Sequence, residues 1–408
     1  MPGLSIILVT MADLPEGGGH TSRLKTLVQA LVRSGHQVEL WNEHGLGTVP
    51  EEMQSASGEI HGAPFCYVLG NTARGHGFRA FATKLRAVRA IRQRLRQAAQ
   101  SRSVDIVWFN QLSFYDVYPL TRLARRWGIR TVQSYEDERF DVAMGGRVPL
   151  PQRLFGLNAW LADRYCPRKA DAIIVISRYL RRKYEALARD PTKVHLVPTI
   201  VDCTQWDCGP ELETNCPSLL YVGAFGQQDE LERLLEVFAL LRAAGRAFRV
   251  VMVGDNRRDP ARMASLASQI EERQLGGIIE WKGFMPLAAV REQVRQAHIL
   301  LNIRRPGVWS DSGLSTKLSE YLASGRLVIT SDVGDVKQYV RDGESALVVS
   351  KGASTEEVAR LLQVGLASPQ RRRTIGLAGQ AVARRFFDVP VAAAQLARML
   401  STLQSEGP

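Results

Sequence analysis

The chain has 408 residues, 45% of them hydrophobic and 23% charged, with a formal net charge of +12. This composition is typical of a soluble globular protein, and the length suits two domains of roughly 200 residues rather than one. No apolar run reaches the ~18 residues of a transmembrane helix, and the apolar residues 1–10 lack the basic leader and cleavage site of a signal peptide. The five cysteines are an odd number in a large chain, which argues against a disulfide framework. They form no Cys-x-x-Cys pair of a zinc site, so we expect reduced thiols in the cytoplasm.

The positive charge is concentrated in one segment. Residues 61–103 contain no Asp or Glu but carry nine basic residues, namely Arg74, Arg79, Lys84, Arg86, Arg89, Arg92, Arg94, Arg96 and Arg102. We expect a helix at 78–102, with an apolar stripe formed by Phe81, Leu85, Val88 and Leu95. A cationic amphipathic helix suits an anionic membrane surface, whereas an ordinary solvated face mixes charges of both signs. The segment lacks the interleaved aromatic residues of a nucleic-acid interface, so we expect no nucleic-acid partner.

The first half of the chain reads as an α/β domain. A strand at residues 4–10 leads into the glycine loop Gly17–Gly19, then into a helix that Thr21 can cap and Gly35 can end, and a second strand follows at 37–41. This order opens a doubly wound fold. Glycines in such a turn let the backbone approach a phosphate or a sugar, and a tight turn without a ligand is the alternative.

Polar residues follow the next two predicted strands, at 105–110 and 131–134. Loops at the carboxyl ends of parallel strands face the ligand crevice in such sheets. The candidates for the acceptor side are therefore Asn110, Gln111, Tyr115, Glu136 and Asp137. Solvated loop polarity is the alternative for each of them. We also expect a helix at 120–127, a strand at 172–176, a helix that Ser177 caps, and a strand at 194–197.

The pattern restarts after a loop-like segment at residues 203–217, where we place the domain boundary. A strand at 219–222, a loop at 223–228, a helix at 230–244 and a strand at 249–253 begin a second Rossmann-like half. Its remaining predicted segments are 278–282, 299–303, 327–329, 336–340 and 346–349 for the sheet, and 356–366, 371–387 and 390–404 as helices.

The most informative stretch is residues 302–334. A helix near 316–324 is predicted by the spacing of Leu314, Leu318, Tyr321 and Leu322. Ser312 or Ser315 can cap its start, and Gly325 suits the left-handed residue just past its end.

Cations gather at the start of this helix. Arg304 and Arg305 precede it, and Lys317 and Glu320 lie in its first turns. Free backbone N–H groups, the positive end of the helix dipole and three cationic side chains predict an anion site sized for phosphate.

The segment Thr316–Gly325 resembles the donor-binding helix of family 4 glycosyltransferases, which have the GT-B fold. The family pattern has two glutamates on this element. The second contacts the ribose of a nucleotide sugar, and Glu320 matches it. The first, which usually contacts the sugar, is replaced by Ser312. A branch of the family with an arginine loop lacks that first glutamate, and Arg304 with Lys317 fits this branch.

The resemblance extends over nearly the whole chain. It implies an acceptor domain at 1–202 and a donor domain at 203–385, both Rossmann-like and facing across a cleft, with a helix at 386–408 crossing back to the first domain. It further implies a retaining transfer of a sugar from a nucleotide diphosphate sugar to a glycan, lipid or small-molecule acceptor. Related enzymes often use lipid-linked acceptors at the inner face of the cytoplasmic membrane.

The same resemblance suggests roles for individual residues. Arg304 and Lys317 are expected to hold the departing phosphate, and Asn110 and Asp137 are further catalytic candidates. The expected donor-binding residues are Gly18, Gly19, Gly223, Phe284, Arg305, Thr316 and Glu320. The arginine and lysine that the family uses to bind pyrophosphate are replaced by Ala224 and Gln228–Asp229, so we expect Arg304 and Arg305 to substitute for them.

No Asp-x-Asp pair occurs in the sequence, so we expect neither a metal nor a cofactor beyond the donor. Two other function classes fit parts of the chain. A binding-only relative that partners an active transferase is consistent with the missing glutamate and the missing arginine–lysine pair. An NAD-dependent oxidoreductase is consistent with the glycine loop and Glu39, but it leaves the second half and the 304–320 cluster unexplained.

Overall fold

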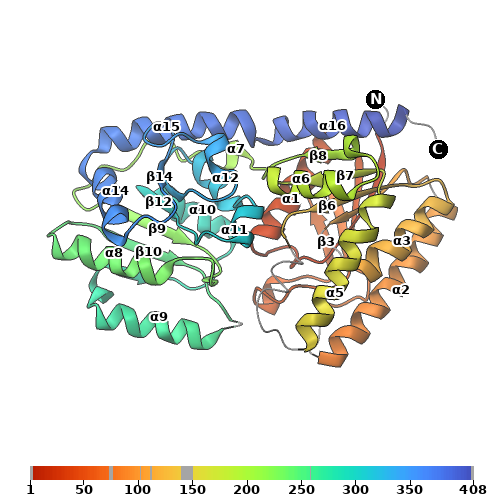
Figure 1. Cartoon of the computed structure of the whole chain (residues 1–408), viewed down its shortest axis with the longest axis horizontal. Coiled ribbons are helices and arrows are strands. Elements are labelled where there is room, and N and C mark those ends of the chain that lie inside the picture. The colour runs from red at the N-terminus through yellow and green to blue at the C-terminus, as the bar shows by residue number, and fades with distance from the viewer. Residues whose placement is uncertain are drawn as a thin grey trace. The chain divides into compact units, whose positions relative to one another are not determined.

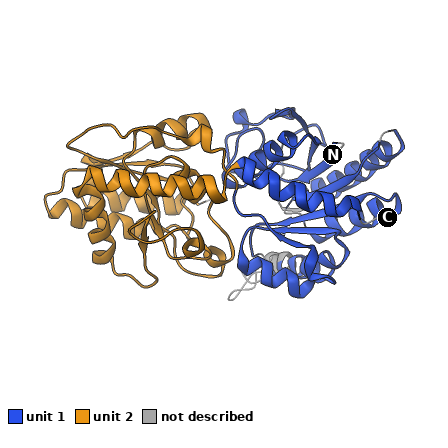
Figure 2. Cartoon of the chain, turned by 90° about the horizontal axis from the view of Figure 1, so that it is seen from above, with its two compact units in different colours: residues 1–199, 389–408 blue, residues 200–388 orange. Residues whose placement is uncertain are grey.

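The structure is a computed structural model that describes residues 3–72, 77–101, 103–110, 113–138, 150–257 and 259–405. Arg74, Arg102 and Gln111 lie outside these ranges. The chain forms two compact units, Met1–Thr199 with Val389–Pro408, and Ile200–Asp388 (Figure 2). We call them unit 1 and unit 2. Each is built on its own sheet, which confirms the prediction of two Rossmann-like α/β domains.

The sheet of unit 1 has the order β3-β4-β2-β1-β5-β6-β7-β8. Its strands are β1 (Ser5–Thr10), β2 (Gln37–Asn42), β3 (Ser57–Ile60), β4 (Ala63–Tyr67), β5 (Ile106–Asn110), β6 (Arg130–Tyr135), β7 (Ala172–Val175) and β8 (Val194–Leu196). Neighbouring strands are parallel except in the β3–β4 hairpin, which the sequence analysis missed. The strand order reverses at β1, which lies between β2 and β5, so the switch point of this sheet is at the carboxyl end of β1.

The helices of unit 1 are α1 (Gly19–Arg33), α2 (Gly77–Ser101), α3 (Phe114–Arg126), α5 (Leu150–Tyr165), α6 (Arg178–Leu187) and α16 (Val389–Ser405), with single turns η1 (Glu51–Met53), η2 (Pro167–Lys169) and η3 (Pro191–Lys193). The C-terminal helix α16 packs on α1, and α3 lies beside both α2 and α5 (Figure 1). Ile91 and Leu95 of α2 are buried against the sheet together with Val107 and Phe109 of β5. The C-terminal half of the apolar stripe of α2 is therefore part of the core.

Two predicted helix starts in unit 1 are wrong. Thr21 lies inside α1 rather than at its cap, because Gly18 is the N-cap and the Thr21 hydroxyl donates to the carbonyl oxygen of Asp13 at 2.9 Å. The helix expected at 120–127 begins at Phe114, because Ser113 and Asp116 form a capping box. Ser177 does cap α6, where its side chain accepts from the Leu180 N–H.

Unit 2 contains an all-parallel sheet with the order β11-β10-β9-β12-β13-β14. Its strands are β9 (Ser218–Val222), β10 (Arg249–Val253), β11 (Ile279–Trp281), β12 (Ile299–Asn302), β13 (Leu327–Ser331) and β14 (Leu347–Val349). Its helices are α7 (Cys203–Trp206), α8 (Leu231–Ala243), α9 (Pro260–Glu272), α10 (Leu287–Gln296), α11 (Val308–Ser312), α12 (Thr316–Ala323), α13 (Val336–Tyr339), α14 (Thr355–Ala367) and α15 (Pro369–Phe386), with the turn η4 (Leu275–Gly277). The segment 336–340, expected in the sheet, is instead the short helix α13.

Helices pack on this sheet in two groups: α8 lies against α9 and α14, and α12 lies against α15 and α7 (Figure 1). The buried cluster joins Leu219 of β9, Ile299 of β12 and Ile329 of β13 to Leu234 of α8 and Leu362 of α14. Because helices cover both faces of a parallel sheet, its central strands are apolar on both faces.

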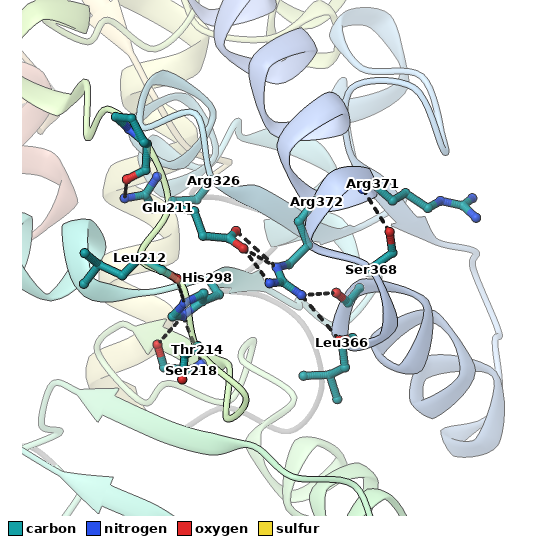
Figure 3. Close-up of polar contacts among 12 residues, drawn as sticks. Glu211, Leu212, Thr214, Ser218, His298, Arg326, Leu366, Ser368, Arg371 and Arg372 are labelled. Carbon is teal, nitrogen blue, oxygen red and sulfur yellow. Dashed lines mark hydrogen bonds and ion pairs between the residues drawn. The ribbon is translucent and has the colours of Figure 1, made fainter.

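The segment after α7 is attached to unit 2 by buried polar contacts (Figure 3). The Arg372 guanidinium, 2% exposed, donates from Nε to both carboxylate oxygens of Glu211 at 3.0 and 3.1 Å. Arg326 donates to the carbonyl oxygens of Gly209 at 2.7 Å and Pro210 at 3.2 Å. His298 lies 2.9 Å from the carbonyl oxygen of Leu212. The stretch that reads as a linker in the sequence is therefore a fixed part of this unit.

The five cysteines all lie in the described ranges and none is in a disulfide. Within the same ranges, no helix is both long and apolar enough to span a membrane.

Candidate active site

The switch point of unit 2 lies at the carboxyl end of β9, which is flanked by β10 and β12. The loops after β9 and β12 pair with each other at this edge. Asp229 and Arg304 form an antiparallel bridge, and the Arg305 N–H donates to the Gln228 carbonyl oxygen at 2.8 Å. This pairing brings both predicted arginines to the position where open α/β sheets bind their ligands.

Helix α12 begins at the same edge and is fixed there by buried contacts. Asn302, 1% exposed at the end of β12, accepts from the Ser315 hydroxyl at 3.2 Å and donates to the Thr330 hydroxyl at 3.0 Å. The Tyr321 hydroxyl accepts from the Val222 N–H at 3.1 Å. Leu318 is fully buried, and each such leucine contributes about 1.5–3 kcal/mol to folding.

Ser315, one of the two residues predicted to cap α12, occupies its N-cap position. Its hydroxyl is used by Asn302, so among the described residues no side chain caps the first N–H groups of α12. Gly325 follows the helix with a φ of 74°, as predicted for the residue past its end. The uncapped start, with Thr316 and Lys317 in its first turn, can therefore accept an anionic group.

Lys317 is a cation in the first turn of α12. Its Nζ lies 3.5 Å from Oδ1 of Asp229 and 4.7 Å from the centroid of the Tyr221 ring, and the side chain is 19% exposed. Burial lowers the pKa of Lys317, Arg304 lowers it further, and Asp229 opposes both. The charges of Lys317 and Arg304 therefore repel each other in the free protein, and an anion placed between them would relieve that repulsion.

Gly223 allows Lys317 to lie close to the β9 loop. A Cβ at this position would stand 2.2 Å from the Tyr221 hydroxyl oxygen and 3.0 Å from the Lys317 Nζ. Tyr221 is fully buried. The space around Gly223 therefore favours a glycine, and its role in donor binding stays a prediction.

The turn after β11 reaches the same edge of the sheet. Gly283 has a φ of 64°, and its carbonyl oxygen accepts from the Gly254 N–H at 2.7 Å. Trp281 donates from its indole to the Gly254 carbonyl oxygen at 3.0 Å and stacks on Phe225 with ring centroids 5.2 Å apart. Phe284 follows this turn and is half-buried. The turn is thus well fixed, as a base-binding turn would need to be.

The other predicted donor residues differ in exposure. Arg305 is exposed, whereas Arg304, Thr316 and Glu320 are half-buried. Glu320 lies on α12 near Lys317 and Tyr321, and its charge raises the pKa of both side chains, although burial is the largest influence on each. The structure therefore brings Arg304, Lys317 and Glu320 together around the start of α12.

Unit 1 contains a second polar cluster, centred on Glu136 after β6. Its carboxylate accepts from Arg23 Nε at 3.0 Å and from Asn110 Nδ2 at 3.1 Å, and its other oxygen lies 3.2 Å from His20 Nδ1. Arg23 also donates to the carbonyl oxygens of Val197 and Pro198. These partners hold the pKa of Glu136 at about 2 although burial alone would raise it.

The predicted residues of unit 1 occupy different places around this cluster. Asn110 is fully buried and also accepts from the Thr10 hydroxyl at 3.4 Å. Asp137 is half-buried. Burial lowers the pKa of Arg23, and the charge of Asp137 opposes this by raising it. Gly18 precedes α1, and a Cβ there would have no heavy atom of the described residues within 4 Å. Gly19 is the first residue of α1. Catalytic roles for Asn110 and Asp137 stay predictions.

His20 and Arg23 were missed by the sequence analysis. Both are in the first turns of α1, one turn of helix apart, so they lie on the same face. Their partner Glu136 is more than 100 residues away in the chain. The sequence feature that could have identified them is the presence of His20 and Arg23, two polar residues, within four residues of the glycine loop.

A third polar group joins α2 to the sheet. Lys84 Nζ lies 2.9 Å from Asp116 Oδ2 and 3.9 Å from Glu43 Oε2, and both acids are fully buried. Burial, with Asp116 next, raises the pKa of Glu43 well above its ordinary value. The expectation that acids are absent around the basic helix is therefore wrong for Lys84, because its partners come from residues outside 61–103.

Two family models match the chain, one described as a glycosyl transferase 4-like domain at residues 18–199 and one as glycosyl transferases group 1 at residues 216–364. Among curated proteins, the chain is 28% identical over 249 residues to the alpha-maltose-1-phosphate synthase of Mycolicibacterium smegmatis, which covers 55% of this chain and 61% of the relative. It is 24% identical over 390 residues to the D-inositol 3-phosphate glycosyltransferase of Nocardia farcinica, covering 91% and 81%. The chain spans about three fifths of the length of two of its curated relatives, 61% of the Mycolicibacterium protein and 58% of the putative colanic acid biosynthesis glycosyltransferase WcaL of Salmonella typhimurium.

Solved structures show the same fold. The sucrose-phosphate synthase of Thermosynechococcus elongatus superimposes with a TM-score of 0.77 at 17% identity, covering 98% of this chain and 99% of the other. The Anabaena protein HepE in complex with UDP-glucose gives 0.70 at 15% identity, covering 98% and 100%. The fold is thus of the GT-B type. Because the two family models match its two halves, the chain belongs to the family 4 glycosyltransferases.

Proposed function

We propose that the protein transfers a sugar from a nucleotide diphosphate sugar to an acceptor. The observation that carries this proposal is the convergence of Lys317, Arg304 and the uncapped start of α12 at the switch point of unit 2. A diphosphate is a good leaving group, so the transfer needs stabilisation of negative charge more than acid catalysis. The HepE structure with bound UDP-glucose supports a nucleotide-sugar donor, because that protein shares the fold.

The two units have separate tasks in this proposal. In unit 2, Arg304, Arg305, Lys317 and Thr316 bind the diphosphate, Glu320 binds the ribose, and Gly223 and Phe284 complete the donor site. In unit 1, the residues around Glu136 bind the acceptor. The proposal includes a hexosyl donor and retention of the anomeric configuration, which family membership supports. It also includes transfer without a metal, which is consistent with the absence of an Asp-x-Asp pair from the sequence.

Release of nucleoside diphosphate from a panel of UDP-, GDP-, ADP- and TDP-sugars tests the proposal. We expect one donor to be cleaved, at an undiminished rate in EDTA, and Lys317→Met to slow cleavage at least tenfold. Lys337→Met is the matched control. Lys337 lies on α13, its side chain is 56% exposed, and it pairs with Asp332 in the preceding loop. Binding of a donor without any cleavage would instead identify a catalytically inactive relative.

We further propose that α2 contacts an anionic membrane surface on the cytoplasmic side, where a lipid-linked acceptor would be found. Arg86, Arg89, Arg92 and Arg96 are exposed on α2. Phe81 and Leu85 of the same helix are 49% and 39% exposed, and the Phe81 ring meets Tyr115 edge-on at 6.5 Å. Exposed arginines beside exposed apolar side chains suit the interface of an anionic bilayer.

Arg94, which the sequence analysis counted in the same surface, has a different role. It is half-buried, and its guanidinium lies 2.8 Å from the Cys66 sulfur and 3.5 Å from the Val68 carbonyl oxygen. Together with Lys84, it attaches α2 to unit 1. The proposed membrane surface therefore excludes Lys84 and Arg94 of the basic segment.

A further inference from the structure

Helix α5 of unit 1 carries an exposed stripe that none of the roles above uses. Arg153, Leu157, Trp160 and Arg164 stand at i, i+4, i+7 and i+11, so they share one face of the helix. All four are exposed, Leu157 by 51% and Trp160 by 42%. We call these four residues the α5 stripe, and we propose that it inserts Leu157 and Trp160 into the interface of an anionic bilayer. This inference rests on the proposed contact of α2 with a membrane and adds a second helix to it.

The opposite face of α5 is fixed inside unit 1. Asn158, which is buried, accepts from the Phe114 N–H of α3 at 3.2 Å. The Asp163 carboxylate lies 2.6 Å from Lys183 Nζ and accepts from the Tyr184 hydroxyl at 2.7 Å, so the acid of α5 is engaged by α6. Contacts with two neighbouring helices therefore set the rotation of α5 and leave the α5 stripe on its outer side.

The start of α3 connects α5 with α2. Helix α3 lies beside both of them (Figure 1). The exposed Tyr115 ring meets the exposed Phe81 ring of α2 edge-on at 6.5 Å. The adjacent Phe114 ring lies 6.0 Å from the ring of Tyr165, which is exposed at the end of α5. Exposed aromatic side chains thus continue from the proposed membrane helix α2 across α3 to α5.

The exposed charges of these three helices have one sign. The sequences of α2, α3 and α5 contain two acids, Asp116 and Asp163, and neither is exposed. Both are paired inside unit 1, Asp116 with Lys84 and Asp163 with Lys183. The exposed basic residues of the same helices are Arg79, Arg86, Arg89, Arg92, Arg96, Arg122, Arg125, Arg126, Arg153 and Arg164. A face on which the exposed charge is all positive complements lipid phosphates, whereas an ordinary solvated face mixes both signs.

The α5 stripe has the side chains that the interface of a bilayer accommodates. An indole ring is favoured at the level of the head groups, and a leucine side chain is favoured at the boundary of the acyl chains. The arginines at both ends of the stripe can extend their alkyl stems along this boundary and keep their guanidinium groups at the phosphates. The two helices then contribute differently: the arginines of α2 supply attraction that salt screens, and the apolar residues of α5 supply burial that salt does not screen.

Sedimentation with sucrose-loaded phosphatidylglycerol vesicles at several salt concentrations tests this division. We expect the double variant Leu157→Gln with Trp160→Gln to partition about tenfold or more weakly at each salt concentration, with the salt dependence of the wild type. Leu377→Gln with Trp309→Gln is the matched control in unit 2, because these side chains are 51% and 47% exposed. The control should partition like the wild type.

Tryptophan quenching provides a second readout with a milder substitution. Vesicles of phosphatidylglycerol that is brominated in its acyl chains should quench part of the tryptophan emission of the wild type. Trp160→Phe should lose this quenching, because the indole proposed to enter the bilayer is gone. Trp309→Phe, which removes a comparably exposed indole from unit 2, should keep it.

Each result decides the question. Wild-type partitioning of the Leu157→Gln, Trp160→Gln variant, or undiminished quenching in Trp160→Phe, would overturn the inference and leave the contact of α2 standing. A dimer in sedimentation velocity without lipid that the double variant dissociates would assign the α5 stripe to a second copy of the chain and also overturn it. If the wild type binds no anionic vesicles, the proposed contact of α2 fails, and this inference fails with it.

Discussion

Lys317 and Asp229 form an ion pair in which Nζ and Oδ1 are 3.5 Å apart, where the loop after β9 meets the start of α12. Family 4 glycosyltransferases commonly place a cation in the loop after β9, and here that loop carries an acid while the helix carries the cation. The Asp229 carboxylate also accepts from the Gly226 N–H at 3.1 Å, so it has a structural task in its own loop. The cation at this edge of the sheet therefore comes from α12 and not from the loop after β9.

The affinity for a nucleoside diphosphate should fall in the alkaline range. Burial lowers the pKa of Lys317, so this lysine loses its proton at a lower pH than an exposed lysine does. The bound diphosphate needs the charged form, so the Kd for UDP should rise in the alkaline range already below pH ~10.4, the pKa of an exposed lysine, as Lys317 is neutralised. Calorimetry at several pH values measures this rise.

Lys317→Arg is the control for this pH dependence, because a guanidinium stays protonated throughout the range. Its Kd should be flat over the same interval even if it starts higher. A wild-type Kd that does not change with pH would show that Lys317 does not contribute its charge to the diphosphate.

Gly223→Ala should destabilise unit 2. The new Cβ would stand 2.2 Å from the hydroxyl oxygen of the buried Tyr221, so we expect a loss of about 1–3 kcal/mol in the free energy of unfolding and at least tenfold weaker UDP binding. Gly226→Ala is the matched control in the same loop, because the three heavy atoms nearest to its Cβ would all belong to the end of the flexible Gln228 side chain. Equal stability of the two variants, measured by denaturant titration, would refute the crowding at Gly223.

Glu136→Gln should cost unit 1 about 3 kcal/mol at pH 7. The pKa of Glu136 is lowered to about 2 in the folded state, against about 4.3 in an unfolded chain, and one unit corresponds to about 1.4 kcal/mol. Because the folded pKa is the lower one, this stability is present above about pH 5 and is lost as the pH falls toward 2.

The wild type and Glu136→Gln should therefore converge in stability at low pH, which urea titrations at pH 7, 5 and 3 measure. Glu16→Gln is the control, because Glu16 pairs with Lys25 at 3.3 Å while 30% exposed, and its loss should cost under about 1 kcal/mol. A gap between wild type and Glu136→Gln that is constant from pH 7 to pH 3 would contradict a lowered pKa at this carboxylate.

The sequence predicted the parts of this structure that depend on local pattern. The strands other than β3 and β4, the left-handed glycine after α12 at position 325 and the cap at Ser177 follow from spacing and turn chemistry within about ten residues. Helices α5, α9 and α10 were not predicted. The cluster of Arg304, Lys317 and Glu320 was predictable because these residues are near one another in the chain.

Other features depend on partners that are distant in the chain. The β3–β4 hairpin is held by the pairing of β4 with β2, and Lys84 is neutralised by Asp116 and Glu43. The Glu136 cluster joins α1, β5 and β6. Spacing in one sequence carries no information on such contacts, so the role of Glu136 as a common partner could not be predicted.

The membrane proposal can be tested by vesicle sedimentation. Changing Arg86, Arg89, Arg92 and Arg96 to Glu should abolish binding to phosphatidylglycerol vesicles at low salt, since each basic residue near an anionic surface contributes about 1 kcal/mol. The wild type should be released as the salt concentration rises. UDP binding should be unchanged in the variant.

A second variant tests whether vesicle binding depends on the position of the arginines or only on the net charge of the protein. Arg341, Arg360, Arg371 and Arg373 are exposed in unit 2, and changing them to Glu alters the net charge by the same amount. This variant should sediment like the wild type. If the wild type ignores anionic vesicles at low salt, or if both variants lose binding equally, α2 is not a membrane surface.

Calorimetric titration decides whether the start of α12 in unit 2 binds a nucleoside diphosphate, on which the proposed function depends. UDP, GDP, ADP and TDP are titrated into the wild type, and the tightest binder is then titrated into Lys317→Ala, Glu320→Ala and the control Lys337→Ala. We expect the first two variants to bind about 10- to 100-fold more weakly, as for the loss of one charge-assisted hydrogen bond, and the control to bind like the wild type. Wild-type affinity in both Lys317→Ala and Glu320→Ala would contradict the assignment of the site.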